Sequence, residues 1–139
     1  MPSKLGNTMM KIGHFSILVK DYDEAANFYT EKLGFVKLAD NAFGPDMRWI
    51  SVAPKKSNET LIVFVKADTP AKKAAIGKQA PGHVLITIDT DNIERDYKKM
   101  KEGGVKFHGA PQAVQWGKEV VFEDLYGNLF DLVERSWQQ

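Results

Sequence analysis

Two of the three histidines in the chain occupy equivalent positions in a repeated segment. Residues 14–38 align without a gap with residues 83–107, and the two segments begin with His14 and His83. At the same offset Gly34 meets Gly103. A repeat of this length indicates a duplicated supersecondary unit. Two similar units can pack about a pseudo-two-fold axis and so bring both imidazoles to one centre. Taken singly, each would be an ordinary strand histidine that bonds to backbone or water.

A single carboxylate interrupts the apolar run Leu129-Phe-Asp-Leu-Val133. Burial of an unpaired carboxylate is costly, so Asp131 needs a cation, hydrogen-bond donors or water as its partner. Metal ligation satisfies this requirement, and so does a hydrogen bond or ion pair in a pocket. The third histidine, His108, lies beside Gly109 at a predicted strand end, where a solvated loop position is expected.

Composition narrows the class of protein. The chain has 139 residues, with 19 basic and 18 acidic residues spread along it, which predicts one domain and no nucleic-acid partner. It contains no cysteine, so disulfides, thiolate metal sites and a cysteine nucleophile are excluded. No apolar run approaches the roughly 18 residues of a membrane span, and residues 1–10 lack an apolar signal core. We expect a cytoplasmic protein without a membrane partner.

Hydrophobic patterns predict the same order of elements in each half. Residues 14–19 form a strand whose alternation places Phe15, Ile17 and Val19 on one face and His14 on the other. A helix follows, capped by Asp21 or Asp23 and ended by Gly34. The second half repeats this pattern, with Val84, Ile86 and Ile88 in the buried set, a Thr90 or Asp91 cap and Gly103-Gly104 as the stop. Further strands are expected near 35–40, 47–53, 60–66, 105–108, 118–123 and 128–134.

The predicted fold class is therefore α+β, with two βαβββ repeats that form curved mixed sheets around a cup-shaped cavity. One domain spans 11–135 and divides into repeat 1 (11–66), a linker (67–82) and repeat 2 (83–135). The linker is rich in proline, glycine, lysine and alanine, and either is mobile or forms one helical turn at 71–76. Each half alone is small for a stable core, so we expect the halves to share a core or to exchange partners in a homodimer.

A pair of βαβββ units that each begin on histidine resembles the vicinal oxygen chelate superfamily, which includes glyoxalase I, extradiol dioxygenases, fosfomycin-inactivating enzymes and bleomycin-binding resistance proteins. The similarity covers about residues 11–135. It rests on four stretches, which are 14–19, Asp21-Tyr-Asp-Glu-Ala-Ala-Asn-Phe-Tyr-Thr-Glu-Lys-Leu-Gly-Phe35, Gly82-His83 and Phe122-Glu-Asp-Leu-Tyr-Gly-Asn-Leu-Phe-Asp-Leu-Val-Glu134. These motifs are specific for the fold but not for the reaction, because the scaffold hosts isomerases, transferases, dioxygenases and binding proteins.

The resemblance implies metal ligands on the first and last strand of each unit. The matching positions here are His14, His83 and Asp131, while the fourth position is Val63, which cannot bind a metal. Glu59 is about 13 Å away along the same strand and cannot replace it. Two histidines and one carboxylate suit a divalent ion such as Fe²⁺, Mn²⁺, Zn²⁺ or Ni²⁺ with open positions. Without the second carboxylate, glyoxalase-type isomerisation is disfavoured.

Other side chains are candidates for the walls of a substrate site. Arg48 and Trp49 lie on the predicted third strand, where at most one of two neighbours faces the cup. An inward Arg48 would hold a carboxylate or phosphate of the substrate. Trp116 precedes the seventh strand and is a candidate for the rim, and Val63 is expected as an apolar wall.

The leading hypothesis is a metalloenzyme, a metal-dependent lyase, isomerase or dioxygenase, that chelates a small oxygen-rich substrate on a divalent metal. The sequence does not identify its general base. The alternative is a metal-free protein that binds or sequesters a small molecule, as bleomycin-binding relatives do. Those relatives tend to be acidic to match a cationic drug, whereas this chain has a net charge of +1, so that ligand is not favoured. A scaffold without a small-molecule role is a third possibility, and the polar strand faces disfavour it.

Overall fold

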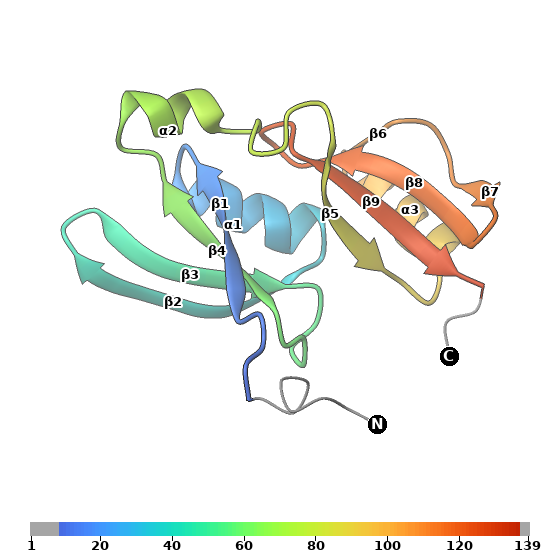
Figure 1. Cartoon of the computed structure of the whole chain (residues 1–139), viewed down its shortest axis with the longest axis horizontal. Helices are drawn as coiled ribbons and strands as arrows, with labels where there is room; N and C mark the ends of the chain where they lie inside the picture. Colours follow the sequence, from blue (N-terminus) through green and yellow to red (C-terminus); the bar gives the residue numbers. More distant parts are fainter. Residues whose placement is uncertain (1–8, 137–139) are drawn as a thin grey trace.

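The computed structural model describes residues 9–136. Their strands and helices form two modules. In each module one main helix, α1 or α3, lies against one face of the sheet (Figure 1). The first module contains β1 (His14–Val19), α1 (Tyr22–Asn27), η2 (Phe28–Lys32), β2 (Val36–Gly44), β3 (Met47–Ala53) and β4 (Leu61–Lys66). Helix α2 (Pro70–Ala75) connects it to the second module, which contains β5 (Val84–Asp89), α3 (Ile93–Glu102), β6 (Lys106–Phe107), β7 (Gln112–Val114), β8 (Gly117–Glu123) and β9 (Leu129–Arg135).

Both sheets are mixed, and they have the same topology. The first has the order β1-β4-β3-β2 and the second β5-β9-β8-β6, with β7 paired to β8. In each module the first strand pairs in parallel with the last, and the other pairs are antiparallel. The α+β fold of two βαβββ modules predicted from the repeat is therefore confirmed.

Local sequence signals set the helix ends. The Asp21 carboxylate accepts a hydrogen bond from the Glu24 amide at the start of α1, as expected of an N-cap. Gly34 follows η2 with a φ of 75°, a conformation that glycine adopts at little cost, and it ends the helix as predicted. The predicted Thr90 or Asp91 cap of α3 is wrong. Asn92 caps that helix by accepting from the Arg95 amide, because the Thr90 hydroxyl instead accepts from the Asn92 amide and donates to Asp96.

The connections after α3 differ from the sequence-based expectation, and the linker contains one of its two expected forms. The strand expected near 105–108 is reduced to the two residues of β6, and Gly109, with a φ of 97°, turns the chain after it. The short strand β7, which we did not predict, takes up the edge of β8 instead. The linker does contain a helical turn, α2, whose Thr69 hydroxyl accepts from the Lys72 amide.

One hydrophobic core extends across both modules, and Tyr29 on η2 lies at its centre. The Tyr29 ring is fully buried and makes edge-on contacts with Phe64 of the first module and Phe130 of the second. Its hydroxyl donates a 2.6 Å hydrogen bond to the Asp124 carboxylate, which also accepts from Asn128. Burial and the nearby Asp124 charge raise the pKa of Tyr29 well above its ordinary value, so the phenol stays a donor. The modules of one chain thus pack through their helix sides.

The six strand residues expected under helices are only partly covered. Ile17 and Val19 are fully buried, whereas the other four, Phe15, Val84, Ile86 and Ile88, are half-buried. The physical reason is that α1 packs on β3 and β4 and α3 packs on β9, which leaves part of β1 and β5 exposed between the modules.

Strand β1 is a sheet edge whose free backbone groups are covered by a side chain. The Gln79 amide accepts from the Leu18 amide at 2.8 Å and donates to the Ser16 carbonyl at 2.9 Å, as a neighbouring strand would. Such cover prevents unwanted pairing of an exposed edge. Across residues 9–136 no helix is long and apolar enough to cross a membrane.

The Tyr29–Asp124 bond leads to a stability prediction. Tyr29→Phe keeps the ring but leaves a buried carboxylate with one donor fewer, so we expect a loss of about 1–3 kcal/mol in the free energy of unfolding. Tyr97→Phe is the matched control, since the hydroxyl of this half-buried ring accepts a hydrogen bond from the exposed Lys101 side chain and not from a buried group. Urea unfolding of the three proteins measures the difference. Equal midpoints for Tyr29→Phe and wild type would contradict the proposed role of the bond.

Candidate functional site

The side of the first sheet that faces away from α1 carries an aromatic pair. Because strand residues alternate and Ile17, Ile50 and Ile62 face the helix, His14, Trp49 and Val63 face the other way. We call this side the open face of the first sheet. The His14 and Trp49 rings meet edge to face with centroids 5.0 Å apart, and Trp49 stays 39% exposed.

Val63 lies beneath this ring contact. His14 pairs with Leu61 on β4, and two residues further along β4 Val63 pairs with both Ser16 and Ser51. Trp49 is two residues from Ser51, so Val63 lies at the midpoint of the diagonal between His14 and Trp49. That position explains why Val63 and Ser51 are only 3% and 1% exposed although they face away from the helix. The two rings therefore form a surface over a small-residue floor.

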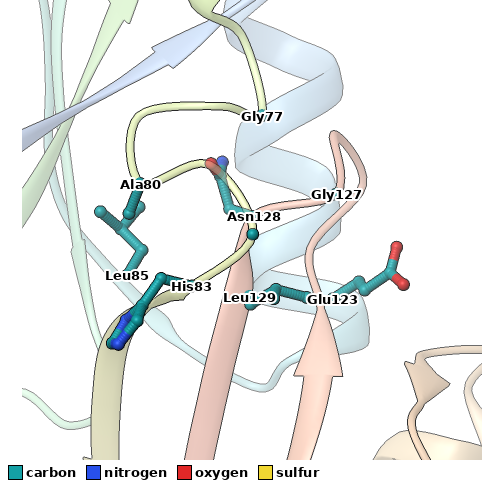
Figure 2. Close-up of a pocket in the computed structure, with 9 residues that line it drawn as sticks. Gly77, Ala80, His83, Leu85, Glu123, Gly127, Asn128 and Leu129 are labelled. Atoms are coloured by element: carbon teal, nitrogen blue, oxygen red, sulfur yellow. The ribbon is translucent and has the colours of Figure 1, made fainter.

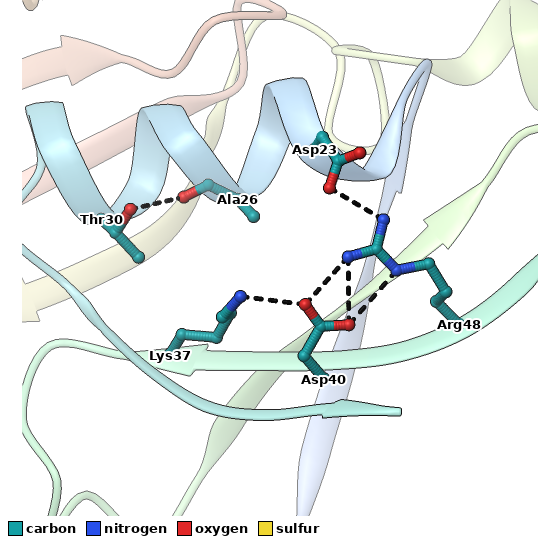
Figure 3. Close-up of polar contacts among 6 residues, drawn as sticks. All are labelled: Asp23, Ala26, Thr30, Lys37, Asp40 and Arg48. Atoms are coloured by element: carbon teal, nitrogen blue, oxygen red, sulfur yellow. Dashed lines mark hydrogen bonds and ion pairs between the residues drawn. The ribbon is translucent and has the colours of Figure 1, made fainter. Parts of the chain in front are cut away.

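Arg48 points the other way from Trp49, as strand alternation requires, so the prediction that it contacts substrate in the cup finds no support in its position. Its guanidinium bonds both oxygens of Asp40 and one oxygen of Asp23 (Figure 3). It also lies 5.7 Å from the Tyr22 ring centroid. Those hydrogen bonds from Arg48, with one from Lys37, hold the pKa of Asp40 below its ordinary value. Arg48 thus ties the first sheet to α1.

The corresponding face of the second sheet is acidic. Phe130 and Leu132 face α3, so Asp131 faces away, on the side shared by Glu119 two steps along β8. Burial and the Glu119 carboxylate raise the pKa of Asp131 to about 6, and Arg135 opposes this shift. One oxygen of Asp131, Oδ1, is buried without a hydrogen-bond partner within residues 9–136. We call this side the open face of the second sheet.

His83 lies directly before β5, beside a small cavity of about 190 Å³ (Figure 2). Leu85, Asn128 and Leu129 also line it, together with the backbone of the linker. The exposed imidazole donates from Nδ1 to the Val84 carbonyl at 3.0 Å, and the Glu123 carboxylate points away from it.

The remaining two candidates lie elsewhere on the second sheet. His108 is exposed, as expected, but its Nε2 is 2.6 Å from the Glu123 carboxylate. This bond and the nearby Lys106 hold the pKa of Glu123 below its ordinary value. Trp116 is 38% exposed in the turn between β7 and β8. It is available for a rim contact but does not adjoin Trp49 in the contacts of residues 9–136.

The side chains that the resemblance implies as metal ligands lie apart in one chain. Within residues 9–136 of one chain, no three His, Asp or Glu side chains are placed to hold an ion. His14 packs on Trp49 in the first module, His83 and Asp131 lie in the second, and valine occupies the fourth ligand position. Within residues 9–136 of a single chain these donors are not placed to hold a metal together, and the predicted ligand set His14, His83 and Asp131 stays a prediction for an assembly of chains.

Two contributors were absent from the sequence-based list of site residues. Glu119, which shares the second open face with Asp131, was recoverable in principle, because a tight β8–β9 turn fixes which residues share a face. Gln79 was not, because its bonds to β1 depend on the path of the linker in three dimensions.

Comparison with known proteins agrees with this architecture. A model of the glyoxalase/bleomycin resistance protein/dioxygenase superfamily matches residues 11–132. The chain belongs to this superfamily. An uncharacterized protein of Shewanella frigidimarina is 41% identical over 129 residues, which cover 92% of this chain and 96% of that protein.

Two solved structures of this superfamily's fold are similar over most of their length. UcmS2 is 32% identical with a TM-score of 0.78, and the match covers 90% of this chain and 98% of UcmS2. TnmS3, an antibiotic binding protein from Streptomyces sp. CB03234, is 32% identical with a TM-score of 0.74 over 92% of this chain and 98% of TnmS3.

The raised pKa of Asp131 gives a pH-dependent stability. A carboxyl whose folded pKa is raised contributes stability below its ordinary pKa of about 3.9, and this is lost as the pH rises through about 6. Asp131→Asn, which stays neutral, should therefore gain stability over wild type between pH 4 and pH 7. The gain should be on the order of 1 kcal/mol after solvent screening. Glu119→Gln should flatten the same slope, as denaturant unfolding across pH would show. If the free energy of unfolding changed with pH in the same way for all three proteins, the effect of Glu119 on the pKa of Asp131 would be contradicted.

Proposed function

We propose that this protein binds a small molecule with a flat aromatic group and holds it on the Trp49–His14 surface without a metal. The single observation that carries the proposal is an exposed tryptophan, fixed edge to face by an imidazole, on the uncovered face of a sheet. The similarity to TnmS3, at 32% identity, supports this choice, because that protein binds an antibiotic. A protein that only sequesters a ligand needs a site with affinity for it and a complementary shape, and it needs no catalytic group.

The physical chemistry of the surface suits such a ligand. An aromatic ring stacked on Trp49 gains about 0.5–1.5 kcal/mol beyond the burial of its apolar area. The edge contact from His14 fixes the indole in place before the ligand arrives, so less side-chain freedom is lost on binding. The small floor of Val63 and Ser51 keeps the two rings close to the sheet.

We propose that a second copy of the chain completes each site. In one chain the helix sides pack together, so the open face of each sheet is uncovered, and a flat face alone encloses little of a ligand. A two-fold dimer that places the first open face against the second would surround the ligand with Trp49 and His14 on one side. Asp131 and Glu119 would then lie on the other side as acceptors for its polar groups.

The metalloenzyme alternative depends on that same assembly. It requires the dimer to bring His14, His83 and Asp131 of different modules to one ion, and it requires His14 to leave Trp49. One observation supports the metalloenzyme: the buried Oδ1 of Asp131 has no hydrogen-bond partner within residues 9–136. Titration with Fe²⁺, Mn²⁺, Zn²⁺ and Ni²⁺ separates the two. Stoichiometric uptake that Asp131→Ala abolishes would replace the binding function with the metal-dependent one.

Trp49 provides the direct test of the proposed site. Titration with a panel of aromatic antibiotics, which includes a fluoroquinolone, a tetracycline and bleomycin, should quench tryptophan fluorescence for at least one compound. Trp49→Ala should weaken that binding at least tenfold, about 1.4 kcal/mol, as expected for an anchoring aromatic residue.

Trp116→Phe is the matched control, because Trp116 has nearly the same exposure but lies in a turn of the other module. It should leave the affinity within about twofold. Full affinity in Trp49→Ala, with loss in Trp116→Phe, would place the site elsewhere and overturn the proposal.

Val63→Glu distinguishes the two functions in one variant. If Val63 is the floor of an aromatic site, a carboxylate there forces the rings apart, and both stability and aromatic-ligand affinity should fall, the stability by roughly 2–4 kcal/mol. If the site is a metal centre that lacks one ligand, the new carboxylate should instead increase metal affinity. Calorimetric titration with Zn²⁺ and with the best antibiotic of the panel reports both outcomes.

A further inference from the structure

A long groove lies between the modules, beside the strands that the helices leave half-covered. It measures about 890 Å³, within the roughly 300–1,000 Å³ of small-molecule sites. It is lined from β1 and β4 of the first module and from β5 and α3 of the second, and His14, Trp49 and Asp131 are not among its lining residues.

Apolar side chains from both sheets form part of the groove lining. Phe15 and Ile62 come from the first sheet, and Ile86, Ile88 and Leu132 from the second. Phe15, Ile86 and Ile88 remain half-buried, although they belong to the apolar face of their strands. Apolar side chains that stay partly accessible to water inside a groove can contact the apolar part of a ligand.

Three lysines surround one end of the groove. Lys55 follows β3 and lies beside Gly34, because Val36 pairs with Ala53. The Lys32 side chain reaches to 4.0 Å from where a Cβ on Gly103 would lie, and Lys99 is one turn before Gly103 on α3. No hydrogen bond or ion pair of the three lysine side-chain amines is found within residues 9–136. The acidic lining residues beside them are Glu31, next to Lys32 in the chain, and Asp96, one turn before Lys99 on α3.

Toward the other end of the groove two arginines bond three carboxylates. Arg95 bonds Asp91 at 2.9 Å and Asp96 at 3.0 Å, and Arg135 bonds Asp89 at 2.8 Å. The lysine end is therefore the positive end of the groove, because its three lysines outnumber the acidic lining residues beside them. A partly apolar lining with cations at one end is complementary to an apolar chain that carries an acidic head group.

We propose that this groove binds a long-chain carboxylic acid, with its hydrocarbon chain along Phe15, Ile86 and Ile88 and its carboxylate at Lys32, Lys55 and Lys99. The site is distinct from the aromatic site around Trp49 and does not depend on it. Burial of each methylene of the chain contributes to affinity, and the lysines select the acid over neutral or cationic amphiphiles.

Isothermal titration of the full chain with dodecanoate, below its micelle concentration, tests the proposal. Dodecanoate should bind with one site per chain, more tightly than dodecyl maltoside and much more tightly than dodecyltrimethylammonium. Lys55→Glu/Lys99→Glu should weaken dodecanoate binding at least tenfold and leave dodecyl maltoside binding unchanged. The matched control is Lys56→Glu/Lys98→Glu, which changes the adjacent exposed lysines that do not line the groove and should alter the affinity by less than twofold.

Trp49→Ala separates this site from the proposed aromatic one, because it should leave dodecanoate binding intact. Equal binding of the three amphiphiles, or equal loss in both double-lysine variants, would overturn the selectivity for an acid. If Ile88→Lys converts a dimer to a monomer in light scattering and dodecanoate does not bind, the groove is an interface between copies, and the proposal is wrong.

Discussion

The buried hydrogen bond between Tyr29 and Asp124 is the contact on which the arrangement of the two modules depends. Neither module of about half the chain can bury its helix side alone, and the Tyr29 ring fills the space between Phe64 and Phe130 while its hydroxyl satisfies a carboxylate of the other module. Packing of the helix sides against each other leaves the opposite face of each sheet uncovered. The candidate site and the proposed role of a second copy both follow from that constraint.

The duplicated architecture is preserved, but its ligand positions have diverged. The histidine that opens the first repeat contacts a tryptophan, and valine fills the floor where the resemblance implies a fourth metal ligand. Burial and the Glu119 carboxylate raise the pKa of the last-strand aspartate, Asp131. One family scaffold thus carries an aromatic surface on one sheet and an acidic one on the other, a combination suited to a ligand with a flat ring and polar substituents.

Sequence patterns predicted the elements well where a single residue determines the outcome. The βαβββ repeat, the cap at Asp21 or Asp23 and the Gly34 stop each depend on neighbours along the chain. The repeat and the stop were correct, and of the two cap candidates the structure has Asp21. The functional surface was harder to predict. That Trp49 and not Arg48 lies beside His14 depends on the register of three strands, and the cover that Gln79 gives to β1 depends on the path of the linker. The half-exposed groove strands were mispredicted because alternation indicates which face is apolar but not how far a helix extends over it.

The central claim is that His14 serves an aromatic site through Trp49 and does not serve a metal. Nuclear Overhauser effects between the His14 imidazole and the Trp49 indole, recorded with and without Zn²⁺, test this claim most directly. The structure predicts strong cross-peaks between the two rings, which persist at saturating Zn²⁺ and shift when an aromatic ligand binds. Loss of those cross-peaks on addition of Zn²⁺, with simultaneous shifts at His14, His83 and Asp131, would contradict it.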